Sequence, residues 1–395
     1  MGTAVTDRHG NFQLRVSVPW SEMPGKLSIS VLDPRFGRIT TILFVLGDWP
    51  EFRHDTAHTG VDGFESAIGV ANASKLGLKW DFPTGGAVVS SPAVANGIVY
   101  VGSNDGSLYA LSTATGKKLW SYPTGGPIMS APAVTKNRVF VYSSGGVFYA
   151  LNATTGKLLW QRSIGADSDS SPVTAGANVY VGTYYDGNLY AFNQATGSML
   201  WNYPTHGALD SPAVAGGIVY VGSQDGHMYA VNASTGAKVW ARSTGPIVGS
   251  SPALANGQVY VGTNDGALYE LSASNGTVTH SATPDGSPIR TSPAVGGGLI
   301  YFGTDYGRTY ALNSTTLAAK WQAPTGFGLR ASAALANGVL YTGGGDYWHL
   351  YGFNAASGAS LWDQYMGADI WSSPAVANGR VYVGSYDQYV YAFGL

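Results

Sequence analysis

A segment of the form Ser-Pro-Ala-Val recurs at a nearly constant interval along most of the chain. Each unit of such a repeat is one supersecondary structure that buries its apolar face against its neighbours. A period near 40 residues in strand-rich sequence is typical of β-propeller blades with four strands each. Eight copies lie 40 or 41 residues apart, counted at Pro92, Pro132, Pro172, Pro212, Pro252, Pro293, Ala333 and Pro374.

The copy that starts at Ser90 shows how a unit is built. Its segment "SSPAVAN" predicts an inner strand, and Asn96 and Gly97 predict a hairpin turn into a second strand, "IVYVGS". The turn "NDG" then leads to a third strand, "SLYALS", because Asn, Asp and Gly tolerate positive φ. A further turn, "TATG", leads to the fourth strand, "KKLWSYP". The chain is therefore predicted to be an all-β, eight-bladed propeller.

The last copy supplies only three strands before Leu395, whereas a spare fourth strand, "KLGLKWDFPTG", lies before the first copy at residues 75–85. We expect the two to pair, so that one blade is built from both ends of residues 76–395. Closure of this kind leaves no free sheet edge in the ring.

Composition excludes several classes of function. Charged residues make up 11% of the chain and the formal net charge is −2, which offers no basic surface for nucleic acid. Cysteine is absent, which excludes disulfides, thiolate catalysis and cysteine-bound metals. The first residues carry no signal-peptide pattern, and the longest apolar stretch, residues 39–46, is too short to span a bilayer. We expect an extracellular, cell-surface or periplasmic protein whose targeting segment is not in this chain.

The turn and fourth strand resemble a known motif. The segments "ALSTATGKKLW", "ALNATTGKLLW", "AFNQATGSMLW" and "AVNASTGAKVW" are similar to the tryptophan-docking motif AxDxxTGxxxW of quinoprotein dehydrogenases and of the wider PQQ-like repeat propellers, including BamB-type proteins. The segment "DWPEFRHDTAHTG" resembles the lead-in that precedes such propellers. This chain departs from the pattern at Glu270 and His280, which replace the motif's Ala and Trp, and at Leu317, which replaces its Gly.

The tryptophans of the repeat are interpreted as structural. They recur once per blade, as architectural positions do, and are expected to wedge neighbouring blades together. They are Trp80, Trp120, Trp160, Trp201, Trp240, Trp321 and Trp362.

The residues before the ring do not fit the 40-residue period. Residues 1–47 alternate as three strands, "NFQLRVSVP", "GKLSISVLD" and "ITTILFV", and resemble the closing strands of a bacterial immunoglobulin-like β-sandwich module. Residues 48–75 are interpreted as a linker or lead-in. His54 and His58 are four residues apart, but we expect a structural role and no metal site there.

One face of the ring is predicted to carry the variable loops. Loops between strands four and one, and between two and three, share this face, and binding specificity tends to reside in such variation. The alternative is drift in solvated loops. The candidate binding residues are Asp167, Asp169, Asp210, Arg290, Phe327, Arg330, Asp369 and Trp371, with an aromatic group at Tyr184, Tyr185, Tyr347 and Trp348.

Two candidates lie at equivalent positions of neighbouring blades. Arg290 and Arg330 could together bind a carboxylate, sulfate or sugar acid, or each could pair with a loop acid such as Asp369. Trp371 could stack on a sugar ring or a flat cofactor. The acids that recur between strands two and three are expected to cap tight turns rather than bind calcium.

These features predict a non-enzymatic binding or scaffold propeller, a monomeric ring that presents its variable face to a protein or glycan. The alternative, implied by the resemblance, is a PQQ-dependent dehydrogenase with cofactor and calcium in the central funnel. Such an enzyme would need acidic and amide ligands, an Asp base and usually a disulfide. The only Glu in residues 76–395 is Glu270, so we expect neither PQQ nor calcium.

Overall fold

The computed structural model describes residues 26–33, 37–44, 47–165 and 169–395, and the chain divides into two units, Met1–Leu46 and Gly47–Leu395. The first unit contains the antiparallel pair β1 (Lys26–Asp33) and β2 (Gly37–Phe44). The third strand predicted for the β-sandwich fragment, "NFQLRVSVP", lies outside the described residues. Among the described residues no helix is long and apolar enough to cross a membrane.

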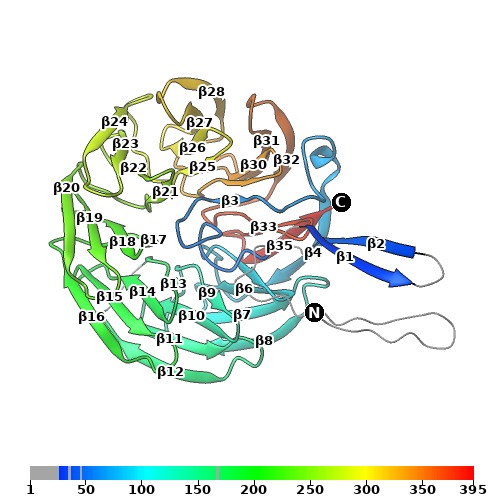
Figure 1. Cartoon of the computed structure of the whole chain (residues 1–395), viewed down its shortest axis with the longest axis horizontal. Coiled ribbons are helices and arrows are strands. Elements are labelled where there is room, and N and C mark those ends of the chain that lie inside the picture. The colour runs from blue at the N-terminus through cyan, green and yellow to red at the C-terminus, as the bar shows by residue number, and fades with distance from the viewer. Residues whose placement is uncertain (1–25, 34–36, 45–46, 166–168) are drawn as a thin grey trace. The chain divides into compact units, whose positions relative to one another are not determined.

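The second unit is an eight-bladed propeller, which confirms the predicted fold (Figure 1). Blades are numbered here in chain order. Blades 1 to 4 are β5 (Ala93–Ala95), β6 (Ile98–Gly102), β7 (Ser107–Ser112), β8 (Lys118–Pro123); β9 (Ala133–Thr135), β10 (Arg138–Ser143), β11 (Val147–Asn152), β12 (Leu158–Ser163); β13 (Val173–Ala175), β14 (Asn178–Gly182), β15 (Asn188–Asn193), β16 (Met199–Pro204); and β17 (Ala213–Ala215), β18 (Ile218–Gly222), β19 (His227–Asn232), β20 (Lys238–Ser243).

Blades 5 to 8 follow the same order from the inner to the outer strand. They are β21 (Ala253–Ala255), β22 (Gln258–Gly262), β23 (Leu268–Ser272), β24 (Val278–Ala282); β25 (Ala294–Gly296), β26 (Leu299–Thr304), β27 (Arg308–Asn313), β28 (Ala319–Pro324); β29 (Ala334–Ala336), β30 (Val339–Gly343), β31 (His349–Asn354), β32 (Ser360–Tyr365); and β33 (Ala375–Ala377), β34 (Arg380–Gly384), β35 (Tyr389–Gly394), β4 (Gly77–Pro83). One short helix of the 3-10 type, η1 (Ala73–Lys75), precedes β4.

The predicted closure is confirmed in blade 8. Strand β4 forms its outer strand and pairs antiparallel with β35, so the two ends of residues 76–395 meet in one sheet. Trp80 lies opposite Ala392, the register that Trp120 has with Ala110 inside blade 1. The spare strand therefore replaces the missing one residue for residue.

Burial explains the order of strands within a blade. Second strands such as "IVYVG" of β6 are buried on both faces because neighbouring blades cover them. Outer strands such as β8 are mostly exposed, and polar and apolar side chains are mixed along them. Apolar runs therefore form the middle of each blade, and mixed sequence forms its rim.

Each repeat tryptophan contacts the next blade. The indole Nε1 of Trp80 donates to the carbonyl of Thr113 at 2.8 Å, and Trp120 does the same to Ala153 at 3.0 Å. In six of the seven cases, all but Trp362, the indole ring lies on a turn glycine of positive φ, where an added Cβ would lie 2.5 to 2.8 Å from the indole. Only glycine fits there, both for backbone and for space. The other five tryptophans of the set, Trp160, Trp201, Trp240, Trp321 and Trp362, make the same hydrogen bond.

One junction, between blades 5 and 6, is built differently. Glu270 and His280 occupy the cross-strand Ala–Trp pair, and His280 Nδ1 lies 3.0 Å from the Glu270 carboxylate. Leu317 occupies the position of the turn glycine on the next blade with φ +53°, and its side chain is buried. A pocket of about 490 Å³ lies at this junction, lined by Leu317, Ala282 and Trp321 among others. The three residues that depart from the repeat thus lie at one junction, where they replace the usual Ala, Trp and Gly as a set.

We expect the three residues to be energetically coupled. His280→Trp alone should destabilise the ring, because it removes the partner of buried Glu270 and sets an indole against Leu317. Adding Glu270→Ala and Leu317→Gly should recover stability beyond the sum of the separate effects, by about 1–3 kcal/mol. Urea unfolding of the single, double and triple variants measures this coupling. Additive effects would show that the three positions act independently.

Residues 49–65 form what we call the channel segment, which runs along the inner strands of the ring (Figure 1). It pairs with the blades in order. Backbone N–H groups of the inner strands donate to its carbonyls, Val94 to Trp49, Val134 to Pro50, Val214 to Thr56, Leu254 to Ala57, Val295 to Thr59 and Leu335 to Gly60. In blade 3 the Thr174 N–H donates to the Glu51 carboxylate, and in blade 8 the Gly379 N–H donates to the Glu65 carboxylate.

The region interpreted as a linker is therefore packed against every blade instead of crossing open space. Its two-residue strand β3 (Val61–Asp62) even extends blade 7, pairing parallel with β29. Arg53 anchors the segment, because its buried guanidinium donates to the carbonyl of Pro293 in blade 6 and to that of Ala333 in blade 7. Burial lowers the pKa of Arg53 to about 9 and raises the pKa of Glu51 to about 8.

Candidate functional site

The variable loops meet on one face, as predicted. The Gly85 N–H, between blades 8 and 1, donates to the Asp105 carboxylate of the neighbouring turn at 2.7 Å. Asp105 also accepts from the Ser107 N–H at 2.8 Å within its own turn, and Asp225 accepts likewise from the His227 N–H at 3.0 Å. These hydrogen bonds are the turn-capping contacts expected of the recurring acids.

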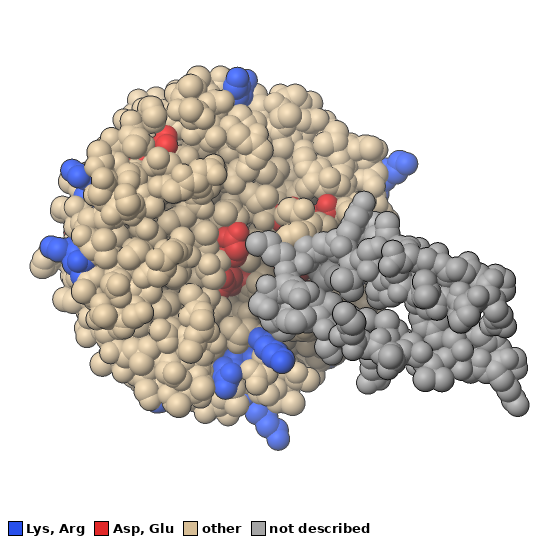
Figure 2. All heavy atoms as spheres, in the orientation of Figure 1, with Lys and Arg blue, Asp and Glu red and all other residues tan. Residues whose placement is uncertain are grey.

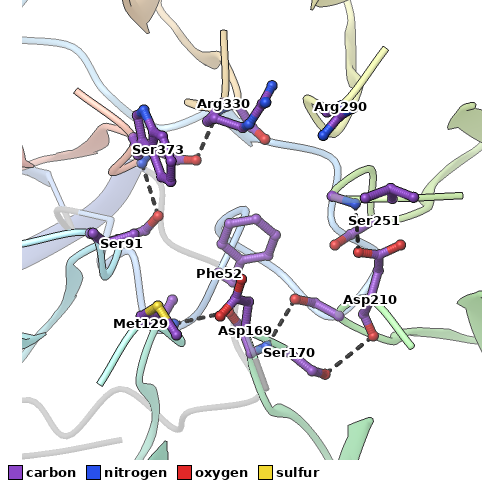
Figure 3. A pocket seen from close by; sticks show the side chains of 18 of the residues that line it. Phe52, Ser91, Met129, Asp169, Ser170, Asp210, Ser251, Arg290, Arg330 and Ser373 are labelled. Carbon is purple, nitrogen blue, oxygen red and sulfur yellow. Dashed lines mark hydrogen bonds between the residues drawn. The ribbon is translucent and has the colours of Figure 1, made fainter. Parts of the chain in front are cut away.

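A pocket of about 320 Å³ opens on this face at the centre of the ring (Figure 3). Phe52 of the channel segment projects into its middle, between acids on one side and guanidinium groups on the other. The channel segment thus supplies part of the pocket, although it is far from the loops in sequence. No sequence signal placed Phe52 at this site.

Serine side chains of the repeat line the pocket. The Ser373 N–H donates to Ser91 Oγ at 2.9 Å, and the Ser171 N–H donates to Ser211 Oγ at 2.9 Å, each linking neighbouring blades. Equivalent bonds run from Ala131, Ser251, Ser292 and Ser332 to the serine of the next blade. Each of these hydroxyls retains its own proton for donation. This partial ring follows from the "SSP" of the repeat, which the sequence showed without revealing its role.

Asp169 and Asp210 form the acidic side. Asp210 occupies a position that is serine in five of the other seven blades. Its Oδ1 accepts from the Gly249 N–H at 2.8 Å, while Oδ2 is buried and accepts no hydrogen bond from the described residues. The pKa of Asp210 is raised to about 7, mainly by burial and to a smaller extent by the charge of Asp169, while the hydrogen bond from Gly249 lowers it.

Asp210→Ser should stabilise the protein at about pH 8. Because the folded-state pKa of Asp210 lies above its ordinary value, its contribution lowers stability as pH rises from about 4 through about 7. Serine would instead accept from the Gly222 N–H, as Ser170 does from Gly182 at 3.0 Å. The expected gain is about 1–3 kcal/mol at pH 8, and it should shrink toward pH 5. Urea unfolding across pH measures it, and a gain independent of pH would contradict the assignment.

Arg290 and Arg330 form the basic side, and they meet on a carboxylate. Arg290 Nε lies 3.1 Å from Asp305 Oδ2, and Arg330 Nη1 lies 2.5 Å from Asp305 Oδ1. The two arginines therefore do converge, and their protein partner is Asp305 rather than Asp369. Asp305 escaped notice because it matches the repeat, where the same acid caps a turn.

Trp371 packs against one arginine of this pair, Arg330. The Arg330 guanidinium lies 5.8 Å from the centre of the Trp371 ring, and Tyr386 packs edge-on to Trp371 at 5.0 Å. The side chain keeps 37% of its surface exposed. Trp371 and Tyr184 both line the pocket, one from the loop before blade 8 and the other from blade 3.

The remaining predicted residues lie outside the pocket lining. Phe327, Tyr347 and Trp348 are exposed on adjacent loops, where the Phe327 N–H donates to the Asp346 carboxylate at 2.7 Å. Tyr185 is 73% exposed, and the Asp369 carbonyl accepts from the Tyr386 N–H. Asp167 lies outside the described residues. Among those that are described, no three His, Asp or Glu side chains are grouped to hold a metal ion.

Charge is sparse over the ring. Figure 2 shows one face on which Lys and Arg side chains are few. The guanidinium pair and the two acids of the pocket are therefore a local concentration of charge on a largely uncharged molecule.

Comparison with known proteins gives a family and a set of structural neighbours. The family model described as outer membrane protein assembly factor BamB matches residues 71–208, 204–333 and 318–394. No curated protein sequence matches the chain.

Three solved structures illustrate the likeness in fold. BamB from Moraxella catarrhalis has a TM-score of 0.70 at 17% identity, over 81% of this chain and 100% of that one. Quinohemoprotein alcohol dehydrogenase from Comamonas testosteroni has a TM-score of 0.74 at 17% identity, over 88% and 80%. A europium-containing methanol dehydrogenase has a TM-score of 0.73 at 15% identity, over 88% and 98%. At such identities the likeness shows the fold, which binding proteins and enzymes share.

Proposed function

The chain belongs to the family described as outer membrane protein assembly factor BamB, and from this premise we propose that it is a non-enzymatic binding propeller. It works outside the cytoplasm, in keeping with the outer-membrane role in the family's name. The variable loop face with its central pocket receives a protein or glycan partner. The rigid ring presents this face in a fixed form, so little ordering is needed on binding.

The observation that carries the proposal is the channel segment. It hydrogen-bonds to the inner strands of the blades, and its Phe52 occupies the middle of the pocket. The central pocket lies on the loop face, with serines, acids, arginines and Trp371 around it. Such a surface suits recognition of a ligand that approaches from outside.

The alternative is a PQQ-dependent dehydrogenase, since two of the structural neighbours are a quinohemoprotein alcohol dehydrogenase and a methanol dehydrogenase. The residues of the pocket fit that cofactor poorly. Asp169 and Asp210 are two carboxylates without a third metal-ligating side chain grouped with them among the described residues. We therefore derive no reaction from this site.

Titration with PQQ and Ca²⁺ tests the proposal. We expect no saturable change in quinone absorbance, no rise in melting temperature and no alcohol-dependent dye reduction. A ligand in excess of its Kd by about 100-fold would stabilise the fold by about 2.7 kcal/mol, so the melting temperature is a sensitive readout. Saturable binding with dye reduction would overturn the proposal in favour of the enzyme.

A further inference from the structure

We propose that the pocket and the loops of blades 6 to 8 bind an acidic polysaccharide, one whose sugar units carry a carboxylate. This inference rests on the proposed function and names the ligand class of the same face. It begins with exposed aromatic rings, because soluble proteins rarely leave many of them on one surface without a partner. Those on the loops of blades 6 to 8 are Tyr306 at 60% exposed, Phe327 at 55%, Tyr347 at 49%, Trp348 at 39% and Trp371 at 37%.

The guanidinium pair supplies recognition of the carboxylate. Arg290 and Arg330 share the single carboxylate of Asp305, which leaves one positive charge uncompensated within the cluster. Arg290 reaches Asp305 through Nε, and Arg330 bonds Asp305 and the Leu329 carbonyl through Nη1. Arg290 Nε lies within ion-pair distance of Asp305 but makes no hydrogen bond to the described residues. Guanidinium groups match carboxylates in geometry and bind them by paired, charge-assisted hydrogen bonds.

Trp371 supplies a platform for a sugar ring beside that charge. Its orientation is fixed by Arg330 over the ring and by Tyr386 at its edge, so stacking costs little conformational entropy. The apolar C–H face of a sugar packs on an indole by dispersion and burial of apolar area. A pocket of about 320 Å³ is at the small end of ligand sites, which suits one or two sugar rings.

The rest of the lining favours a sugar over an acidic peptide. The serine hydroxyls donate and accept, and the carboxylates of Asp169 and Asp210 accept from sugar hydroxyls. A polyglutamate chain offers carboxylates and amides but no hydroxyl groups. The pocket is thus complementary to a molecule with both hydroxyls and a carboxylate.

Calorimetric titration of the full chain tests the inference with three probes of equal length. These are oligogalacturonate, the same oligosaccharide with its carboxyls reduced to alcohols, and oligoglutamate. We expect oligogalacturonate to bind, with affinity that falls as salt is raised. Reduction of the carboxyls should weaken binding at least about tenfold, a loss of about 1.4 kcal/mol, and oligoglutamate should bind at least about tenfold more weakly.

Variants locate the site. Arg330→Gln and Trp371→Ala should each weaken oligogalacturonate binding about tenfold or more, whereas Trp371→Phe should stay within about threefold because it keeps the aromatic face. Arg308→Gln is the matched control, since Arg308 is exposed and bonds Gln322 at 2.9 Å outside the pocket lining. Melting temperatures confirm that each variant is folded.

Three results would overturn the inference: no binding of oligogalacturonate, equal binding of the reduced sugar, or equal binding of oligoglutamate. The last would assign the face to an acidic peptide instead. None of them touches the proposed function, which fails separately if PQQ binds and dye is reduced.

Discussion

Arg53→Met is expected to lower the free energy of unfolding by about 2–5 kcal/mol, because two buried carbonyl groups would each lose a hydrogen-bond donor at a cost of about 1–3 kcal/mol. The guanidinium donates to the carbonyls of Ala333 and Pro293 and is almost fully buried. Methionine fills similar space but leaves both carbonyls without this donor. The channel segment would then lose its anchor to blades 6 and 7. Urea unfolding followed by tryptophan fluorescence measures the change.

Two further variants sharpen this test. Arg53→Lys keeps the charge, but a single ammonium lacks the fork geometry that reaches two carbonyls, so we expect an intermediate loss. Arg308→Met, at an exposed arginine, should change stability by no more than about 0.5 kcal/mol. A loss for Arg53→Met as small as that of Arg308→Met would show that the channel segment contributes little to the stability of the ring.

A chain that begins at Thr84, and so lacks β4, is expected not to form a stable monomeric ring. Strand β35 would present an open edge of unpaired N–H and C=O groups, a template for association with other chains. Blade 8 would also lose Trp80, whose indole bonds the Thr113 carbonyl of blade 1. Light scattering after size-exclusion chromatography should report oligomers or aggregate in place of a monomer.

The control is a chain that begins at Leu76, which keeps β4 but lacks the channel segment. It should remain monomeric with a lowered melting temperature, because the closing strand still pairs with β35. If the chain from Thr84 is equally monomeric and melts at the same temperature, strand exchange between the chain ends is not what closes the ring.

The sequence predicted the blades well because a blade is a local structure repeated eight times. Strand order, turn positions and the role of β4 all follow from one period and one unmatched strand. It did not predict the channel segment, since that segment has no repeat and an irregular backbone. Arg53, His54 and His58 all have positive φ, which is uncommon for residues other than glycine.

The candidate site was predictable only where it breaks the repeat. Arg290, Arg330, Asp210 and Trp371 were found because their positions differ between blades. Asp305 was hidden by its agreement with the repeat, and a turn-capping acid in sequence proves to be the counter-ion of two arginines in space. Phe52 could not be found at all, since its place in the pocket depends on the path of the channel segment.

The path of the channel segment also bears on how the number of blades is maintained during evolution. Neighbouring repeats of similar sequence can recombine unequally, which adds or deletes a whole unit and leaves the other units in frame. The channel segment meets all eight blades in chain order, within residues 49–65. In a ring of nine units, one inner strand would have no part of the segment to pair with. In a ring of seven units, carbonyls of the segment would lack donors. The segment therefore matches a ring of eight blades. We expect chains with one unit more or one unit fewer to fold less stably and so to be selected against.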